Sequence, residues 1–468
     1  MTNQNFIHND FLLQTPIAKM LYNNFAKNEP ILDYHNHLSP KDIAEDRQFK
    51  TITQIWIEGD HYKSRAMRAN GIDEKFITGD ASDLDKFKKW AETVPYTLRN
   101  PLYHWTHMEL QMYFGISDLL NADNAEEIYH KCNELLQKPA YSVKNLLRKL
   151  SVKVVGTTDD PTDDLMYHKK LQDDQFEIKI LPTFRPDKFV NIENQADFLV
   201  FLEKLENRVG YAISNYDLLL KSLDERHAFF HEMGGRISDH GHSNYFFETT
   251  TIEEVSALFL KLKNKEKLTA IETDKYKTYT LLELAKMNHK RGWTQQFHVG
   301  AIRNNNSRMT QLLGPDKGFD SVGSPNNVEK MSLFLDNLNL ANQLTKTIVY
   351  NLNSSENEMI AAMVANFNEG PIAGKMQYGA AWWFLDQKNG IENQLEVISN
   401  FGLLSRFVGM ITDSRSFMSF SRHDYFRRIL CNIVGQDVEN GLLPNNMELV
   451  GTMVKNICYE NAANYLKL

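Results

Sequence analysis

Short apolar or β-branched runs alternate with longer helical patterns through most of this sequence. Such alternation is typical of βα units and predicts a parallel sheet covered by helices. Seven runs are candidate strands, at residues 31–36, 153–157, 178–183, 236–238, 296–300, 347–351 and 407–412. An eighth strand at residues 51–57 would complete a (β/α)8 barrel, so the predicted fold class is α/β with a barrel architecture.

The stretch between the first two candidate strands is too long for one crossover and is mostly helical in pattern. Helices are expected there at residues 86–92, 103–114, 125–136 and 142–150, and elsewhere at 15–26, at 196–208 before Gly210, at 279–291 before Gly292, and in a segment ending at Gly435. No linker, low-complexity tract or repeat divides the chain. The sequence therefore predicts one catalytic domain over residues 1–468, with residues 41–150 as a helical insertion.

The composition excludes several classes of protein. With 52 Lys and Arg against 60 Asp and Glu, the formal charge of −8 gives no global positive field for nucleic acid. No apolar run approaches the roughly 20 residues that cross a bilayer, and the N-terminal residues lack the features of a signal peptide. The three cysteines are far apart without a CxxC pair, which argues against a disulfide framework or a zinc-thiolate site. We expect a cytoplasmic protein without nucleic-acid or membrane partners.

The first candidate strand runs into His35-Asn36-His37. Because side chains alternate along a strand, the two imidazoles project to the same face and could share one metal ion. The pattern alone is weak, since a second pair occurs at His240 and His242 and either pair could be structural. The position of His35 and His37 at the end of an apolar strand favours a functional role.

Other candidate strands also end in polar residues. In a parallel barrel the functional groups lie at the carboxyl ends of the strands, so we expect these residues at one rim. They are Asp159, Arg185, Asp187, His240, His298, Arg303, Asp413 and Arg415. For each one the alternative is a helix cap or a solvated loop residue, and this alternative is strongest for Asp159 and Asp187.

Three of these rim residues are arginines, which bind carboxylate or phosphate groups bidentately. The sequence contains neither GxxxxGK[ST] nor GxGxxG, so a nucleotide or dinucleotide is a poor candidate and a small carboxylate is the simpler one. GxSxG is also absent, and a serine-hydrolase site is unsupported.

Eight sequence segments, taken in their order along the chain, resemble the motifs of a known family. They are DYHNHLSP (33–40), GDHYKSRAMRANG (59–71), RNPLYHWTHMEL (99–110), GTTDDPTDDL (156–165), PTFRPDK (182–188), SDHG (238–241), QFHVGAIRNNN (296–306) and TDSRSF (412–417). On these segments the chain resembles the uronate isomerases (glucuronate isomerases) of the amidohydrolase superfamily over nearly its whole length. The resemblance implies a distorted TIM (β/α)8 barrel. It also implies interconversion of D-glucuronate with D-fructuronate, and of D-galacturonate with D-tagaturonate, in hexuronate breakdown.

The same resemblance assigns the site residue by residue. It implies one divalent metal ion, expected to be zinc and not strictly required, at His35, His37 and Asp413. It implies catalytic roles for Asp413, Tyr62, Arg415 and His61, and substrate contacts from Arg185, Arg303, His298, Asn304 and Trp382. No strand-end lysine is present to carry a bridging carboxylate, and Arg185 occupies that region, so a binuclear metal centre is not expected.

An aldose becomes a ketose when a proton moves from C2 to C1 through a cis-enediol. We expect Asp413 to act as base and Tyr62 to donate or relay a proton, while the metal ion or Arg415 polarises the carbonyl. Arg185 or Arg303 would hold the C6 carboxylate, and His61 would be a nearby polar group. A metal ion on Asp413 would weaken it as a base, so the two roles compete and both stay open.

Two other functions use overlapping residues. A metal-dependent hydrolase of the superfamily, a lactonase or deaminase, would bind zinc at His35, His37, His240 or His298, and Asp413 to activate water. A non-catalytic sugar-acid binding protein would need only the arginines. Trp382 and Trp383 could line a sugar site or belong to a helix that packs on the barrel. A homo-oligomer is expected.

Overall fold

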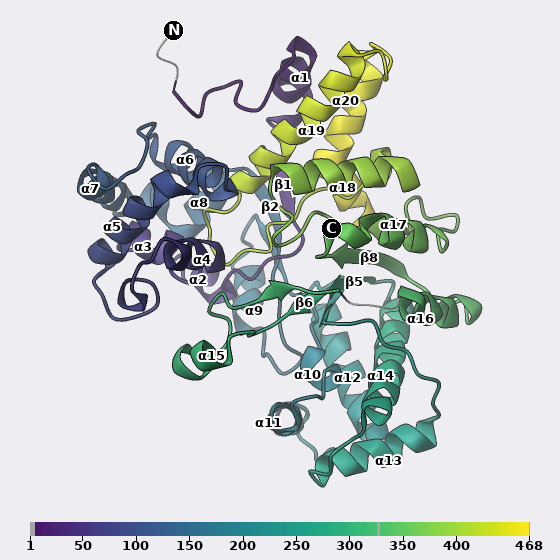
Figure 1. Cartoon of the computed structure of the whole chain (residues 1–468). Helices are drawn as coiled ribbons and strands as arrows, with labels where there is room; N and C mark the ends of the chain where they lie inside the picture. Colours follow the sequence, from purple (N-terminus) through teal and green to yellow (C-terminus); the bar gives the residue numbers. More distant parts are fainter. Residues whose placement is uncertain (1–4, 325–327, 468) are drawn as a thin grey trace.

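A computed structural model describes residues 5–324 and 328–467 of the chain, and its framework is a set of short parallel strands (Figure 1). The strands are β1 (Ile31–Asp33), β2 (Val152–Gly156), β3 (Lys179–Leu181), β4 (Ile237–His242), β5 (Thr294–Val299), β8 (Lys346–Asn351) and β9 (Met376–Tyr378). They pair in parallel in two runs, β1-β2-β3 and β4-β5-β8-β9. Phe184 joins the runs through parallel bridges to Asp159 and Ser238. The strand order thus follows the chain order, as in a (β/α)8 barrel, and the α/β class is confirmed.

The eighth strand position is occupied by residues 407–412, which form no regular strand. Gly409 interrupts the extended conformation with φ +79, and a Cβ there would lie 2.4 Å from the carbonyl oxygen of Ile457. Beyond it, Thr412 donates its backbone N–H and its hydroxyl to the Asp33 carboxylate at 2.8 and 2.6 Å. The Asp33 side chain of β1 therefore holds this segment where a regular strand ladder is absent.

Besides the strand expected at residues 407–412, two sequence expectations are wrong and one strand was missed. Residues 51–57 contain the helix α3 (Ile52–Trp56), whose N-cap Thr51 accepts from the backbone N–H of Gln54. The seventh strand in space is β9, and a run of three residues is too short to stand out in the sequence. The helix expected to end at Gly435 continues to the end of α19 (Ser421–Glu439), because that glycine makes a contact: a Cβ would lie 2.5 Å from the backbone nitrogen of Ala18 in α1 (Pro16–Leu21).

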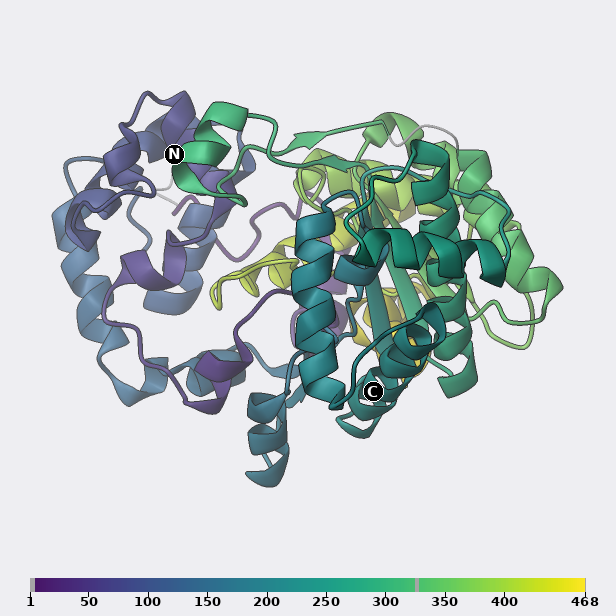
Figure 2. The same ribbon diagram turned by 90° about the horizontal axis from the view of Figure 1, so that it is seen from below.

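The helices between β1 and β2 form a group to one side of the strands (Figure 2). Besides α3 they are α2 (Pro40–Ala44), α4 (His61–Ala69), α5 (Asp83–Thr93), α6 (Pro101–Phe114), α7 (Ala125–Leu136) and α8 (Val143–Lys149). The four helices expected here from the sequence are all present. Asn100 caps α6 and Asp60 caps α4, and each accepts a backbone N–H with its side chain.

The remaining helices surround the strands. They are α9 (Met166–Asp173), α10 (Asp187–Val190), α11 (Gln195–Val209), α12 (Tyr216–Glu232), α13 (Ile252–Lys263), α14 (Ala270–Arg291), α16 (Val328–Leu340), α17 (Asn357–Ala365), α18 (Lys388–Phe401), α20 (Met447–Lys455) and α21 (Asn461–Leu466). As predicted, α11 and α14 end at glycines with positive φ, Gly210 and Gly292. No described helix has the length and apolarity of a membrane span.

Residues 301–322 form an arm that leaves β5 and lies against α4 (Figure 2). The arm contains β6 (Ala301–Ile302), α15 (Ser307–Leu313) and β7 (Ser321–Val322), and its two strands pair antiparallel. Arg65 and Arg68 of α4 donate to the carbonyl oxygens of Asp320 and Lys317 at 2.7 and 2.6 Å. The arm therefore connects the barrel rim to the helical group.

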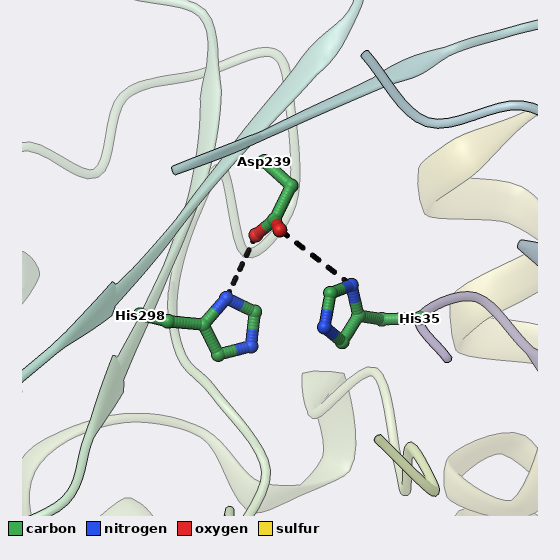
Figure 3. Close-up of side chains that lie close together, drawn as sticks. All are labelled: His35, Asp239 and His298. Carbon is green, nitrogen blue, oxygen red and sulfur yellow. Dashed lines mark hydrogen bonds and ion pairs between the residues drawn. The ribbon is translucent and has the colours of Figure 1, made fainter. Parts of the chain in front are cut away.

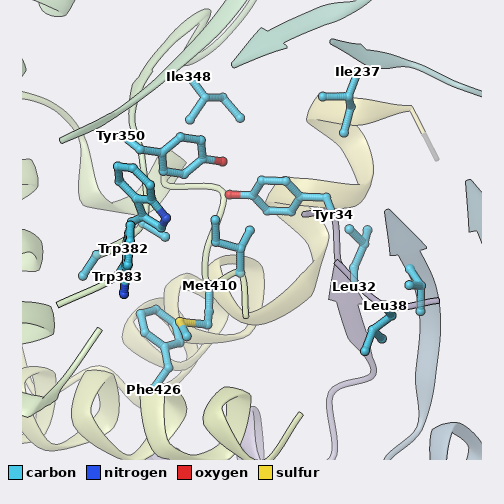
Figure 4. Packing of buried hydrophobic residues seen from close by; sticks show 14 of the residues in the cluster. Leu32, Tyr34, Leu38, Ile237, Ile348, Tyr350, Trp382, Trp383, Met410 and Phe426 are labelled. Carbon is cyan, nitrogen blue, oxygen red and sulfur yellow. The ribbon is translucent and has the colours of Figure 1, made fainter. Parts of the chain in front are cut away.

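An aromatic and aliphatic layer fills the interior below the rim. Tyr34, which follows β1, and Tyr350 of β8 point their hydroxyl ends toward each other, with Ile237 and Ile348 beside them (Figure 4). Both tyrosine side chains are fully buried. Tyr350 donates to the side-chain oxygen of Gln296 at 3.0 Å, which orients that amide toward the rim. This closely packed layer supports the polar residues at the rim from below.

Candidate active site

The Asp413 carboxylate lies at the centre of the predicted site. Nε2 of His35 and Nε2 of His37 lie 3.2 and 3.0 Å from its Oδ1 atom, and Trp382 donates its indole N–H to Oδ2 at 2.5 Å. Residues about 380 positions apart in the chain are thus brought together. Trp382 belongs to the loop after β9 and not to a helix, so the helical alternative for this segment is wrong.

The backbone of Asp413 has a φ of +45, a conformation that residues other than glycine rarely adopt. Its N–H donates to the carbonyl oxygen of His35 at 3.2 Å, and the N–H of His37 donates to that of Ser414 at 2.9 Å. Such strain costs about 1–3 kcal/mol and persists where surrounding contacts enforce it, often at functional sites. These two bonds fix the carboxylate against both histidines.

A second carboxylate, Asp239 of β4, lies fully buried between His35 and His298 (Figure 3). Its oxygens lie 2.7 Å from Nδ1 of His298 and 4.0 Å from Nδ1 of His35. Because a carboxylate only accepts, Nδ1 of His298 is the donor, which leaves Nε2 of a neutral ring as an acceptor. That buried atom has no hydrogen-bond partner among the described residues and is available to a ligand.

Arg185 is paired with two carboxylates. Its NH1 atom lies 3.0 Å from Asp239, and its Nε donates to Asp187 at 2.9 Å. Asp187 also accepts the backbone N–H of Gly241 at 3.0 Å. The guanidinium is therefore fixed beside the two histidines and is less free to move to a ligand than an unpaired arginine.

Gly241 leaves the space that Arg185 needs, since an added Cβ would lie 2.4 Å from NH2 of that arginine. Gly241→Ala should push the guanidinium away from Asp239. A displacement of about 1 Å in a positioning group can cost roughly 10²-fold in rate. We expect kcat/KM to fall by 10- to 100-fold while the melting temperature changes by only a few degrees. Unchanged kinetics would show that the position of Arg185 is unimportant.

The charges around the site favour ionised carboxylates. Although burial opposes ionisation, the hydrogen bonds from His35 and His37 hold the pKa of Asp413 well below its usual range. Burial also opposes ionisation of Asp239, yet the Arg185 guanidinium keeps the pKa of Asp239 well below its usual range. Burial lowers the pKa of His37 to about 4. Neutral histidine and ionised aspartate are the forms in which these side chains bind metal ions. Asp413 and His37 are in these forms, whereas for His35 the opposing effect of burial is outweighed by the Asp239 and Asp413 carboxylates, which raise its pKa.

The described residues fit one divalent metal ion. One ligand atom from each of His35, His37 and Asp413 lies within 4.8 Å of the others. Tetrahedral zinc at about 2.0–2.2 Å from each ligand separates its ligands by roughly 3.4 Å, close to the 3.2 and 3.0 Å between the Asp413 carboxylate and the two imidazoles. A second such group, His35, Asp239 and His298, already has the Arg185 guanidinium at its carboxylate. This charge argues against a second metal ion.

Tyr62 and His61 begin α4. The Tyr62 hydroxyl donates to Asp386 at 2.8 Å and accepts the backbone N–H of Phe384 at 3.1 Å. The His61 ring lies 6.4 Å from that of Trp383. Tyr62 is thus attached to the loop that carries Trp382, whereas the His61 side chain makes no hydrogen bond among the described residues.

The other two predicted arginines are more open than Arg185. Arg303, whose side chain is 44% exposed, lies 4.6 Å above the Trp383 ring and 3.4 Å from the Asp320 carboxylate. Arg415 is exposed, and within the described chain its guanidinium has neither a hydrogen bond nor an ion pair. The Asn304 side chain accepts the N–H of Asp316 at 3.2 Å and so serves a turn within the arm.

Sequence patterns missed three residues of this site. Asp239 could have been found by applying the two-residue period from the buried Ile237, which places Asp239 inside and His240 on the other face against Phe297. Gln296 lies 3.1 Å from Nδ1 of His35 and follows from the same period. Asp386 lies in a loop and has no local signal.

Comparisons with known proteins identify the family. The sequence model of the glucuronate isomerase family (UxaC) matches residues 3–466. The uronate isomerase of Bacteroides thetaiotaomicron is 53% identical over 466 residues, covering 99% of this chain and all of the relative. That of Cellvibrio japonicus is 50% identical over 462 residues, covering 98% of both chains.

A solved structure supports the same assignment. The uronate isomerase from Thermotoga maritima superposes with a TM-score of 0.93 at 32% identity, covering 99% of this chain and all of that one. These matches favour an aldose–ketose isomerase over the hydrolase alternative. Since they extend over the full length of both partners, this chain belongs to the glucuronate (uronate) isomerase family.

Proposed function

We propose that this protein interconverts D-glucuronate with D-fructuronate, and D-galacturonate with D-tagaturonate, in hexuronate catabolism. The observation that carries the proposal is the fixed Asp413 carboxylate, which lies between two imidazoles and an indole. A single base that serves both C2 and C1 is what proton transfer through a cis-enediol requires.

Asp413 is the proposed base. It removes the C2 proton, the electron pair of the C2–H bond forms the C1–C2 double bond, and the π electrons of the C1–O1 bond move to O1, which becomes an enediolate oxygen. O2 then loses its proton and O1 gains one. Asp413 returns its proton to C1, and O2 becomes the ketone oxygen. An ionised carboxylate has about four lone-pair directions. The contacts from His35, His37 and Trp382 use three of them, so one remains for the substrate.

The arginines have different proposed tasks. Arg303 is the better candidate for the C6 carboxylate, because its guanidinium has only one carboxylate partner at 3.4 Å, whereas Arg185 has two at 3.0 Å or less. Arg415, which has no such partner, would stabilise the enediolate oxygen. Trp382 would hold Asp413, and Nε2 of His298 would accept a sugar hydroxyl. His61 and Asn304 contribute nearby polar groups.

A divalent ion, zinc by expectation, would be held by His35, His37 and Asp413. When bound, it would supply a Lewis acid that polarises the substrate oxygens. Asp239 would orient His298 through its Nδ1 atom, and the Gln296 amide, 3.1 Å from Nδ1 of His35, would orient that ring.

Zinc titration of the metal-stripped protein by calorimetry should reveal one equivalent of tight binding. His37→Ala removes a metal ligand and should weaken zinc binding by at least about 10²-fold. Removing only a residue that hydrogen-bonds to a metal ligand already costs up to about that factor in metal affinity. Two equivalents would contradict the single-ion proposal.

The function is tested by incubating the purified protein with glucuronate and galacturonate side by side, with and without added zinc. We expect ketose formation from both uronates, with some activity remaining after chelation. Turnover of a lactone or amide that a chelator abolishes would identify a hydrolase. Tight uronate binding without exchange at C2 would identify a binding protein.

Two coarser expectations complete the proposal. Cys132, Cys431 and Cys458 are buried free thiols, which suits the reducing cytoplasm. A homo-oligomer is the proposed assembly, and size-exclusion chromatography with light scattering would measure it.

A further inference from the structure

Asp386 is a buried carboxylate in the loop between β9 and α18, with 5% of its surface exposed. One of its oxygens accepts the Tyr62 hydroxyl at 2.8 Å, and the other lies 3.3 Å from NH1 of Arg422. It carries none of the roles assigned above. Its position behind Tyr62 suggests that it acts through that tyrosine.

The hydrogen bonds of Tyr62 can be counted completely. A phenol has one proton to donate and two lone pairs with which to accept. The backbone N–H of Phe384 can only donate and occupies one lone pair, and an ionised Asp386 can only accept and takes the proton. One lone pair remains free, so a ligand that reaches the Tyr62 oxygen meets an acceptor.

Arg422 of α19 supports Asp386. Its guanidinium is buried, lies 4.3 Å above the Trp105 ring of α6, and is 3.4 Å from the carbonyl oxygen of Thr412, the neighbour of Asp413. Burial raises the pKa of Asp386, and the Arg422 guanidinium counteracts this by favouring the carboxylate. One side chain thus connects Tyr62 of the helical group, the loop after β9 and the segment that carries the base.

We propose that Asp386, paired with Arg422, is a positioning residue that directs the Tyr62 proton away from the substrate, so that Tyr62 receives a proton from a sugar hydroxyl before it returns one. This inference rests on the proposed isomerase mechanism. When the sugar O–H bond breaks, its proton passes to the Tyr62 oxygen and the original Tyr62 proton passes to Asp386. The reverse transfer restores both groups when the other sugar oxygen is protonated.

The test is a double-mutant cycle with Tyr62→Phe and Asp386→Asn in the full-length protein. The amide can turn its NH2 group toward Tyr62 and so reverse the direction of that hydrogen bond. Each single variant should lower kcat by about 10²-fold, the lower range for general acid–base catalysis, with KM within about 3-fold. The double variant should be no slower than the slower single variant, within about 2-fold.

Glu109→Gln is the matched control, because Glu109 is a similarly buried carboxylate that accepts the indole N–H of Trp56 and, among the described residues, has no hydrogen bond with Tyr62. It should leave kcat unchanged even if the melting temperature falls. If Asp386→Asn does not fold, Arg422→Lys replaces it in the cycle, and the same loss of kcat with the same non-additivity is expected.

Two results would overturn the inference while the isomerase mechanism stands. One is near-normal kcat for Asp386→Asn when Tyr62→Phe is slow, and the other is multiplied losses of about 10⁴-fold in the double variant. Near-normal kcat for Tyr62→Phe would instead remove Tyr62 from the proposed mechanism, and with it the task of Asp386.

Discussion

Asp413→Asn should lower the rate of C2 proton exchange with solvent by about 10²- to 10⁴-fold, the range that a positioned general base contributes. The amide keeps the size of the side chain and can still accept the indole N–H of Trp382, but it cannot take a proton from carbon. Nuclear magnetic resonance of glucuronate in deuterium oxide measures the exchange directly. The overall conversion to ketose should fall in parallel.

The same variant needs a measure of folding, because Asp413 has positive φ and contacts both His35 and His37. Asparagine tolerates this backbone conformation, so the melting temperature should change little. Uronate binding should also stay within a few-fold of that of the original protein. Exchange at a near-normal rate in a folded, binding-competent variant would remove Asp413 as the base.

Arg303→Met should weaken binding of acidic sugars far more than binding of neutral ones. A charge-assisted hydrogen bond to carboxylate contributes about 1.5–3 kcal/mol, which corresponds to roughly 10- to 100-fold in affinity. We therefore expect the KM for glucuronate to rise by this factor, with a smaller change in kcat. Calorimetric binding of D-glucose should be nearly unaffected.

Two further variants sharpen this test. Arg303→Lys keeps the charge but loses the planar fork, so an intermediate KM is expected. Arg308→Met removes an exposed arginine of α15, on the same arm, and should leave both sugars unaffected. Equal losses for the acidic and the neutral sugar in Arg303→Met would refute the carboxylate contact.

Much of this arrangement could be predicted from the sequence, for identifiable reasons. The apolar or β-branched runs in β1, β2 and β8 are almost wholly buried, so they stand out from the amphipathic helices around them. His35, His37 and Asp413 follow such segments, and the rule that parallel barrels gather function at one rim places them at the same end of the strands. Their grouping into one site came from the family resemblance.

The rest depends on tertiary contacts that leave no local pattern. The strand β9 is three residues long, and residues 407–412 take the eighth position through the side chain of Asp33 instead of a backbone ladder. Asp386 and Arg422 come from a loop and from the middle of a helical pattern. Only the folded chain shows that they meet at Tyr62.

The most direct test of the central claim is the conversion of D-glucuronate labelled with deuterium at C2. If a base transfers this atom as a proton, the label must leave C2 in every turnover and appear at C1 of the ketose and in the solvent, more slowly than protium. Loss of part of the label to solvent would identify a proton on an exchangeable group. Ketose that retains all of its deuterium at C1 with none in the solvent, as a direct hydride shift would give, or a hydrolysis product, would contradict the account.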